Sequence, residues 1–516
     1  METKILSHKD PTTGLALDTL SKRKQALVFC ASKRAAESQA EKIAKTIKND
    51  SLLSLSEQIL HVLANPTKQC RRLASCVRKG IAFHHAGLAS KQRELIEDHF
   101  RKGDISIICS TPTLAAGLDM PAFRSIIRDT KRFGPRGMQP IPVLEYEQMS
   151  GRAGRPGKED YGEAIIIASK EGDIEYYTDR YINGEVEELY SKLAVEPVLR
   201  TYVLSLVSTE FIKSTQELYD FFDTTFYAHQ YGDTQKLHAT LDRMIGILRR
   251  WEFLEGEQRK ETIDFVSASD LEGQLSEQLV ATPLGKRVSE MYIDPLTAHT
   301  LLTGLPGLSI VSDEAFALSH LLCCALELRP LLGTKVGDLE LIESLRESRQ
   351  TLITEEEFYR ISQDDFEDTL KTAKFFEDWM NEMTEDQLLE TYQVRPGEIS
   401  IKMQTADWLL YACEELARMK QMQPLLKIIK RVRTRVKHGV RNELIPLLSF
   451  KGIGRSRARK LFSHNIQKVS DVTQTSYEKL STIVGTKIAA NLKEQVGEKV
   501  EVPQKAIKKR VTLHDF

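Results

Sequence analysis

Short apolar, β-branched runs alternate with amphipathic stretches in the first 170 residues, and this alternation constrains the fold more than any other feature. The stretches 33–47 and 91–101 have the periodicity of helices. Five runs are typical of buried strands: residues 26–30, 81–84, 105–110, 125–128 and 164–168. Strands that alternate with helices predict a parallel α/β sheet covered on both faces. Ligands of such sheets bind beyond the carboxyl ends of the strands, so the segments that follow the strands are the candidate sites.

The pattern changes after residue 171 to long amphipathic helices. Helices at 196–208, 214–226 and 234–250, followed by strand-like runs at 252–254 and 279–282, predict a winged helix. A winged helix binds DNA in some proteins and only packs between domains in others. Residues 301–435 are predicted to be entirely helical, and a compact unit with two glycine-containing turns follows. A chain of 516 residues is too long for one core, so the whole is multidomain, α/β plus α.

The basic residues are concentrated near the C-terminus, although the net charge is only -1. Residues 427–510 contain 21 basic and 6 acidic residues, so a polyanion is expected to bind there. No run of apolar residues is long enough for a membrane helix, and the N-terminus has no signal core, so we expect a cytoplasmic protein without membrane contact. Cys70, Cys76, His84 and His85 have no standard zinc-ligand spacing, so no metal site is predicted.

Four segments of the predicted α/β domain stand at strand ends or helix starts. They are LVFCASKRAAE (27–37), GIAFHHAGL (80–88), STPTLAAGLDMPA (110–122) and QMSGRAGRPG (148–157). They occur in the order found in the second RecA-like domain of superfamily 2 helicases. Each alone is modest evidence, but a chance match to all four in order is improbable.

The last of these segments places Arg152 and Arg155 three residues apart, on one side of a helical turn. Gly151 and Gly154 remove side chains that would hinder close approach. A planar guanidinium binds phosphate in two places and stabilises charge as it develops. We therefore expect Arg152 and Arg155 to reach the γ-phosphate of ATP across a domain cleft; the alternative is an arginine pair in surface salt bridges.

Hydroxyl groups and glycines in the other three segments suit a nucleic-acid backbone. In residues 110–122, Thr111 supplies a hydroxyl at a strand end, and Gly117 permits a tight turn that presents backbone N–H groups. Ser32, His85 and Gly87 are similarly placed after strands, although two adjacent histidines are more often structural. The expected nucleic-acid contacts of this domain are therefore Ser32, His85, Gly87 and Thr111.

The whole chain resembles the archaeal Ski-like DNA repair helicases of superfamily 2, whose relatives include the helicase half of DNA polymerase theta. The supporting segments are IPVLEYEQMSGRAGRP (141–156), TFYAHQ (225–230), ATPLGKRVSEMYIDPLTA (281–298) and TADWLLYACEELAR (405–418). The resemblance implies that Gln148 orients water or phosphate and that Asp119 couples to the arginine motif or to the nucleotide ribose. It also implies this domain order: second RecA-like domain 1–172, linker 173–195, winged helix 196–298, helical ratchet domain 299–438, helix-hairpin-helix 439–500 and tail 501–516.

The resemblance further places a strand-separating β-hairpin within residues 124–147, with Phe133 or Met138 as the wedge; an ordinary connection between strands is the alternative. Trp408, on a long helix, is expected to stack on a base, or else to pack in the core. Some relatives have an arginine seven residues before this tryptophan. Here Ile401 stands at that position, and Lys402, the next residue, is the expected nucleic-acid contact of this helix beside Trp408.

The segment FKGIGRSRARKLFSHNI (450–466) is typical of a helix-hairpin-helix. Gly452 and Gly454 let the backbone approach a phosphate, whose charge is met by N–H groups at a helix start and by Arg455, Arg457 and Arg459. This pattern predicts DNA binding without sequence preference; a protein-interaction bundle is the alternative.

The end of the chain resembles a sliding-clamp-binding tail in the spacing of Leu513 and Phe516. Arg510 stands where that motif usually has glutamine.

The sequence contains neither a GxxxxGK[ST] phosphate loop nor a buried strand that ends in Asp-Glu, the groups that grip ATP and Mg²⁺. Asp313 and Glu314 resemble an acidic box but are predicted to begin a helix. We therefore predict the C-terminal portion of an ATP-dependent 3′ to 5′ DNA helicase that acts on single-stranded or forked DNA in replication-fork repair. The chain would be a truncated or split helicase. Its ATP and Mg²⁺ would be held mainly by a first motor domain that is absent from this chain, and without that domain it would not hydrolyse ATP. A separate chain that carries the first motor domain is a candidate partner. The alternatives are a non-catalytic DNA-binding or regulatory module and, disfavoured by the DNA-type hairpin, an RNA helicase.

Overall fold

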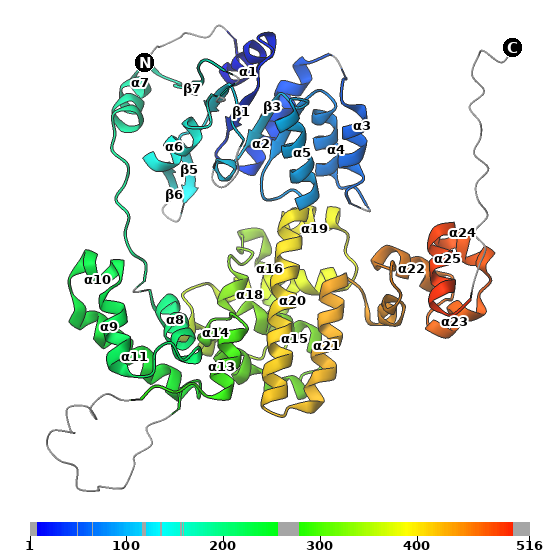
Figure 1. Cartoon of the computed structure of the whole chain (residues 1–516). Helices are drawn as coiled ribbons and strands as arrows, with labels where there is room; N and C mark the ends of the chain where they lie inside the picture. Colours follow the sequence, from blue (N-terminus) through cyan, green and yellow to red (C-terminus); the bar gives the residue numbers. More distant parts are fainter. Residues whose placement is uncertain are drawn as a thin grey trace. The chain divides into compact units, whose positions relative to one another are not determined.

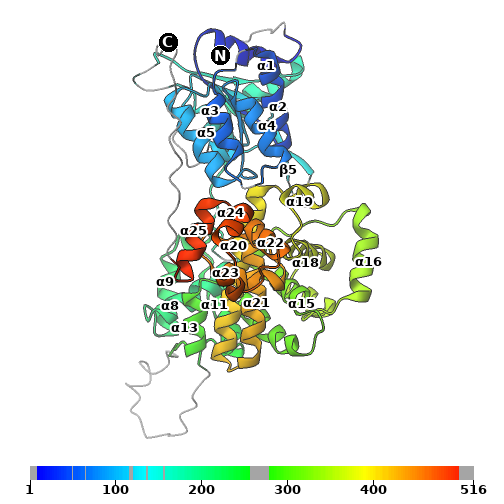
Figure 2. The ribbon, with the colours of Figure 1, turned by 90° about the vertical axis from the view of Figure 1, so that its right-hand side faces the viewer.

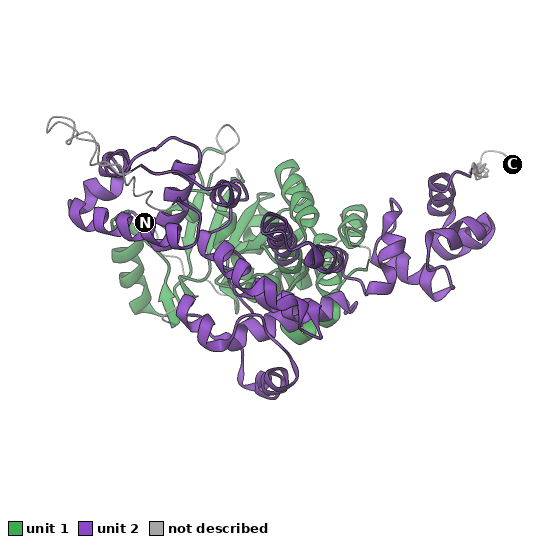
Figure 3. Ribbon diagram, turned by 90° about the horizontal axis from the view of Figure 1, so that it is seen from below, with its two compact units in different colours: residues 1–190, 385–401 green, residues 191–384, 402–516 purple. Residues whose placement is uncertain are grey.

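The computed structural model describes residues 8–498 except 49, 64, 116–119, 135–136, 155–156, 158, 194 and 256–277 (Figure 1). The chain forms two compact units (Figure 3). The first consists of residues 1–190 together with 385–401, and the second of residues 191–384 and 402–516. A segment far along the chain therefore belongs to the N-terminal unit.

The first unit is built on a five-stranded parallel sheet with the strand order β2-β3-β1-β4-β7. Its strands are β1 (Ala26–Phe29), β2 (Ile81–His84), β3 (Ile107–Ser110), β4 (Arg124–Ile127) and β7 (Glu163–Ile166). Each of the five lies within a predicted run or within one residue of it, and the predicted parallel arrangement is confirmed. The strands β1 to β4 are buried along their whole length, as expected when helices cover both faces of a sheet.

Helices connect and cover these strands (Figure 1). The predicted helices appear as α2 (Lys33–Thr46) and α5 (Ser90–Lys102), the latter ending at Gly103 with a left-handed φ of 89°. The other helical elements of the first unit are α1 (Pro11–Ser21), α3 (Leu53–Leu60), α4 (Lys68–Val77), η1 (Pro112–Leu114), α6 (Val143–Ser150), α7 (Glu171–Tyr177), η2 (Thr178–Ile182) and α19 (Glu385–Tyr392). Between β4 and α6, the strands β5 (Lys131–Gly134) and β6 (Gly137–Pro140) form an antiparallel hairpin inside the segment where a hairpin was expected.

The second unit begins with α8 (Glu196–Ser208), α9 (Thr215–Asp223), α10 (Phe226–Tyr231) and α11 (Thr234–Arg250). The predicted helical segment 214–226 is divided between α9 and α10. Leu254 and Ala281 form an antiparallel bridge, as do Ser214 and Gln278. The tip of the expected wing, residues 256–277, lies outside the described residues.

The predicted helical region follows: α13 (Pro283–Glu290), α14 (Pro295–Gly304), η3 (Leu305–Ser309), α15 (Glu314–Cys323), η4 (Leu326–Leu328), η5 (Val336–Asp338), α16 (Leu339–Ser348), α17 (Glu355–Ile361), α18 (Phe366–Met380), α20 (Pro396–Met419) and α21 (Gln423–His438). Asp313 caps α15 by accepting a hydrogen bond from the N–H of Phe316, which confirms that this acid begins a helix. The helices α20 and α21 lie side by side in both Figures 1 and 2.

The last described elements share a small core of their own. They are η6 (Asn442–Ser449), α22 (Arg455–Ser463), α23 (Val469–Gln474), α24 (Tyr477–Val484) and α25 (Thr486–Gln495). The two predicted glycine turns precede α22 and α25, where Gly452 and Gly485 have φ angles of 85° and 89°. These left-handed angles favour glycine. Within the described part of the chain, no helix is both long and apolar enough to cross a membrane.

Candidate functional site

Three of the predicted nucleic-acid contacts gather at one edge of the sheet. β1, β2 and β3 are neighbours, and the register pairs Phe29 and His84 with Ser110. Ser32, His85 and Thr111 follow these strand ends within three residues. The parallel topology therefore brings together segments that lie far apart in the sequence, as expected for a site beyond the carboxyl ends.

The two hydroxyl groups at this edge remain accessible. Ser32 is exposed and caps α2, where its Oγ accepts a hydrogen bond from the N–H of Ala35 at 3.1 Å. The Oγ1 atoms of Thr111 and Thr113 are 2.9 Å apart, and Thr111 is half-buried. A cap accepts but does not donate, so the Ser32 hydroxyl proton is still free to reach a phosphate oxygen.

His85 does not face solvent. Its side chain is 0% exposed, and its ring stacks on Phe83 with the centroids 5.6 Å apart. Nδ1 accepts a hydrogen bond from the N–H of Gly87 at 3.2 Å, and Nε2 lies 3.2 Å from Oε1 of Glu37. Burial lowers the pKa of His85, so the neutral ring is favoured. These contacts favour the structural alternative for His85.

Glu37 is the centre of a buried polar network that the sequence did not reveal. It accepts hydrogen bonds from Gln69 at 2.7 Å, from Arg72 at 2.7 Å and from Arg395 at 3.1 Å. Burial alone would raise the pKa of Glu37, but the hydrogen bonds from His85 and Gln69 and the charge of Arg395 outweigh it and hold that pKa well below its usual value. Glu37 is therefore an ionised carboxylate that is only 4% exposed at its side chain.

The segment 385–401 covers Gly87 as well. The N–H of Gly397 donates to the carbonyl of Gly87 at 3.0 Å. A Cβ atom at Gly397 would lie 2.3 Å from the carbonyl oxygen of Leu88 and 2.4 Å from that of Ala86, so only glycine fits there. Gly87 is therefore buried, and it is not accessible for the contact with nucleic acid that was expected of it.

The arginine motif lies beside residues 110–122. The Nε atom of Arg152 donates to the carbonyl of Ala115 at 3.1 Å, and Nη2 donates to the same oxygen. Ala153 forms a parallel bridge with Ala122, and the N–H of Gly154 donates to the Ala122 carbonyl at 2.7 Å. Gly117, Asp119 and Arg155 belong to these two segments but lie outside the described residues.

The arginine motif is at the opposite edge of the sheet from Ser32. Ala122 precedes β4, so its partner Ala153 lies near the amino ends of the strands. Gln148 is exposed in the last turn of α6, and Arg152 is half-buried and makes no ion pair with a described residue. One segment, residues 110–122, therefore connects the carboxyl edge with the arginine motif.

The hairpin β5–β6 pairs Phe133 with Met138. The side chain of Met138 is 61% exposed, as a wedge residue requires. Arg132 and Glu145 form an ion pair of 2.6 Å between the hairpin and α6. The side chain of Phe133 lies outside the described residues.

Trp408 and Lys402 make internal contacts on α20. Trp408 is half-buried, and its Nε1 donates to the carbonyl of Met291 at 3.0 Å. The Nζ atom of Lys402 lies 2.7 Å from the carbonyl oxygen of Pro330. The tryptophan contact favours the packing alternative, while Ile401 is exposed on the same helix.

The three arginines of α22 have different surroundings. Arg457 is exposed and donates to the Gly452 carbonyl at 2.8 Å, and Gly454 is also exposed. The guanidinium of Arg455 lies 4.9 Å from the ring centre of Trp379 and donates to the Met383 carbonyl at 2.6 Å. Of the three, Arg457 is the one most open to a ligand.

Arg459 is held by two carboxylates. Its Nε donates to Glu382 at 2.7 Å, and its Nη2 donates to Glu382 and, at 2.9 Å, to Glu443. The hydrogen bond to Glu382 raises the pKa of Arg459 further above its usual value. The predicted clamp contacts Leu513 and Phe516 lie outside the described residues.

Two known protein families match parts of this chain. The conserved C-terminal domain of helicases matches residues 12–157, and domain 4 of archaeal helicases matches residues 316–439. The first match includes all four sequence segments of the first unit. The second includes most of α15 to α21.

Several archaeal proteins, each named ATP-dependent DNA helicase Hel308, are similar over nearly the whole chain. The Methanococcus vannielii protein is 36% identical over 94% of this chain and 67% of its own length. The Pyrococcus abyssi protein is 36% identical over 95% of this chain and 66% of its own length. The Methanocella arvoryzae protein is 35% identical over 95% of this chain and 65% of its own length. The chain spans about two thirds of the length of these relatives. It therefore belongs to the Hel308 family of superfamily 2 DNA helicases.

Proposed function

We propose that this chain is the C-terminal portion of an ATP-dependent motor that moves 3′ to 5′ along single-stranded or forked DNA, in the repair of replication forks. The observation that carries this proposal is the contact of Arg152 with Ala115. Residues 110–122 thereby touch the arginine motif and also supply Thr111 at the edge where Ser32 lies. A change at the nucleotide can thus reach the nucleic-acid contacts through one short segment.

ATP and Mg²⁺ would be held mainly by a first motor domain. The Mg²⁺ would supply positive charge that neutralises the phosphates. On this chain, Arg152 fits a phosphate because its guanidinium has no carboxylate partner among the described residues. Arg155 would stabilise the charge that develops on the γ-phosphate, and the exposed amide of Gln148 would orient the attacking water.

The second unit would supply most of the DNA contacts. We assign residues 196–298 to a winged helix, 299–438 to a helical ratchet domain and 439–500 to a helix-hairpin-helix that binds phosphates through Gly452, Gly454 and Arg457. In support, α8, α9 and α11 are the expected three helices, and glycine turns precede α22 and α25. The same family resemblance supports the hairpin β5–β6 as the strand-separating element.

The test combines this chain with the first motor domain of a relative and measures DNA-stimulated ATP hydrolysis. We expect no hydrolysis by either part alone, activity on mixing, and a loss of roughly 10³-fold or more in Arg155→Ala, as for other arginines that contact the γ-phosphate. Restored activity that ignores Arg155→Ala would refute the assignment of that arginine.

A non-catalytic DNA-binding module is the second candidate, because the sequence has no phosphate loop. Tight binding of forked DNA by this chain alone, together with no ATP hydrolysis in any mixture with a first motor domain, would support this second function.

A further inference from the structure

The helix α21 (Gln423–His438) has an unusual charge pattern. Its sequence, QPLLKIIKRVRTRVKH, contains six lysines and arginines and no aspartate or glutamate. Four of these cations are exposed: Lys427, Lys430, Arg431 and Lys437. Exposed helices usually carry acids three or four residues from their bases, because such pairs stabilise the helix, whereas like charges at this spacing destabilise it.

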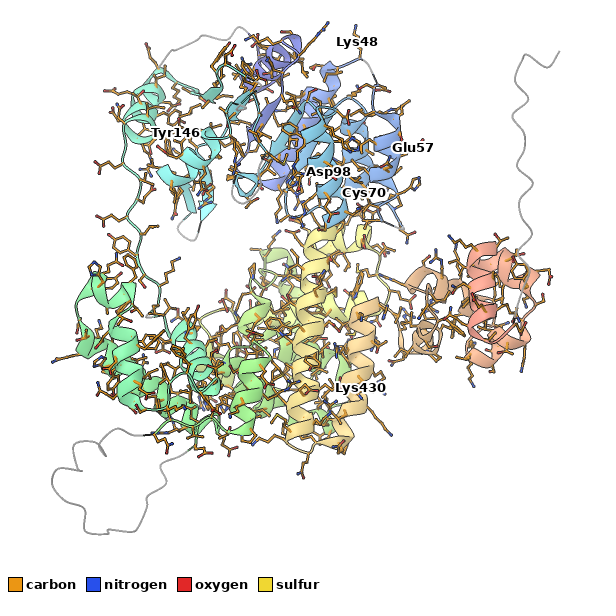
Figure 4. The ribbon with its side chains drawn as sticks, viewed as in Figure 1. Lys48, Glu57, Cys70, Asp98, Tyr146 and Lys430 are labelled. Carbon is orange, nitrogen blue, oxygen red and sulfur yellow. The ribbon has the colours of Figure 1, made fainter. Side chains whose placement is uncertain are left out.

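The lysines of α21 share one face. The apolar side of the helix, with Leu425, Ile429 and Val436, is buried. At 100° per residue, Lys427, Lys430 and Lys437 all project from the opposite side. They extend over ten residues, or roughly 15 Å of helix. Figure 4 labels Lys430 on α21.

Carboxylates of neighbouring helices neutralise little of this face. Arg431 pairs with Glu314, and Arg433 with Asp407 at 2.8 Å. Lys430 lies 3.5 Å from Glu414, which is also shared with Arg433 and Arg418. Among the described residues, no carboxylate pairs with Lys427 or Lys437. The negative end of the helix dipole favours cations in the last turn only, so it accounts for Lys437 but not for Lys427 or Lys430.

Lys427 therefore has no ion-pair partner among the described residues, and Lys430 shares its one carboxylate with two arginines. A bound polyanion would relieve the mutual repulsion of the three lysines. The three lysines follow one another along roughly 15 Å of the helix, so each can meet a different phosphate of an extended single strand. Lysine binds phosphate as a point charge, and α21 has no exposed aromatic side chain on which a base could stack. Binding there would be to the backbone, without sequence preference.

We propose that the face of α21 formed by Lys427, Lys430 and Lys437 is a nucleic-acid-binding surface that holds the phosphates of a single strand. The surface is additional to the hairpin of Gly452 and to the contacts of the first unit. The proposal rests on the proposed function and deepens it. The lysines of α21 supply cations for DNA, whereas Arg455 and Arg459 of α22 already donate hydrogen bonds to Met383 and Glu382.

The experiment compares two triple variants of the full chain. In the first, Lys427, Lys430 and Lys437 are each replaced by glutamine. In the control, the same charge is removed from three exposed lysines of the first unit: Lys45 in the last turn of α2, Lys48 just after α2, and Lys102 at the end of α5. Fluorescence anisotropy with a labelled 40-nucleotide oligothymidylate gives the affinity of each protein over a series of salt concentrations, and thermal melting shows that each is folded.

The α21 variant should bind roughly tenfold more weakly at about 0.1 M salt, and the slope of log K against log salt should fall by about 2, since each phosphate contact to a single strand contributes about 0.7. The control should bind like the wild type. Equal affinity and slope in the two variants would overturn the α21 surface but not the helicase assignment. A wild-type chain that binds no single strand would overturn both.

Discussion

Replacement of Glu37 by glutamine tests the buried network that joins α2, α4 and the segment 385–401. Glutamine has the same shape but no charge, so Arg72 and Arg395 lose the carboxylate that faces them, and Arg395 keeps little access to water. Loss of one partner from a buried ion pair costs about 3 to 5 kcal/mol. Arg72 retains its pair with Glu41, so we expect the lower end, about 3 kcal/mol.

The first unit has about 200 residues, for which 1 kcal/mol corresponds to about 2 to 4 °C in Tm. Glu37→Gln should therefore lower the calorimetric Tm of this unit by roughly 6 to 12 °C. The matched control is Glu41→Gln, which removes the same charge from a carboxylate that also pairs with Arg72 but is 30% exposed. A partly exposed pair contributes less than about 1 kcal/mol.

Hydrogen exchange adds a local readout, because the amide of Gly397 should exchange faster in Glu37→Gln than in Glu41→Gln. Equal Tm values for the two variants, with an unchanged exchange rate at Gly397, would contradict the prediction. The network would then not anchor the segment 385–401, and that segment would not stabilise the first unit.

Three further predictions follow from individual contacts. Gly397→Ala should destabilise the first unit by more than about 1 kcal/mol in urea unfolding, because the new Cβ would lie 2.3 and 2.4 Å from two carbonyl oxygens. The control is Gly246→Ala in α11, where the new Cβ has open space around it. This control should stabilise the chain by up to about 1 kcal/mol. The free energy of unfolding should fall as pH drops below about 6.5, since burial lowers the pKa of His85 and only the unfolded chain takes up the proton there; His85→Gln should remove this part of the pH dependence. Arg457→Gln should reduce the slope of log K against log salt for DNA binding by about 0.7. Arg459→Gln should leave that slope unchanged and lower the thermal stability, because Arg459 binds Glu382 and Glu443. Equal slopes for the two variants would contradict the prediction that only Arg457 contacts DNA.

The sheet could be predicted because each strand is a short apolar run between helical stretches, and a strand buried on both faces needs such a run. The start of α15 could also be predicted, because Asp313 is a residue type that satisfies free N–H groups at a helix start. These features depend on residues that are close in the sequence.

The buried network could not be predicted, since Glu37 and Arg395 are 358 residues apart and neither stands in a pattern that marks its partner. The same limitation applies to Arg459. Its position shortly after Gly454 predicted a phosphate contact, but in the fold it donates to the carboxylates of Glu382 and Glu443. Charged residues in a motif indicate a binding surface, but only the fold shows which of them already have partners.

Strand separation on forked DNA tests the central claim most directly. A mixture of this chain with the first motor domain of a relative should separate a forked duplex only when ATP is present and the single-stranded tail that it enters ends in a 3′ terminus. A mixture that binds the fork but separates neither polarity, with or without ATP, would contradict the assignment of this chain to a DNA-translocating motor.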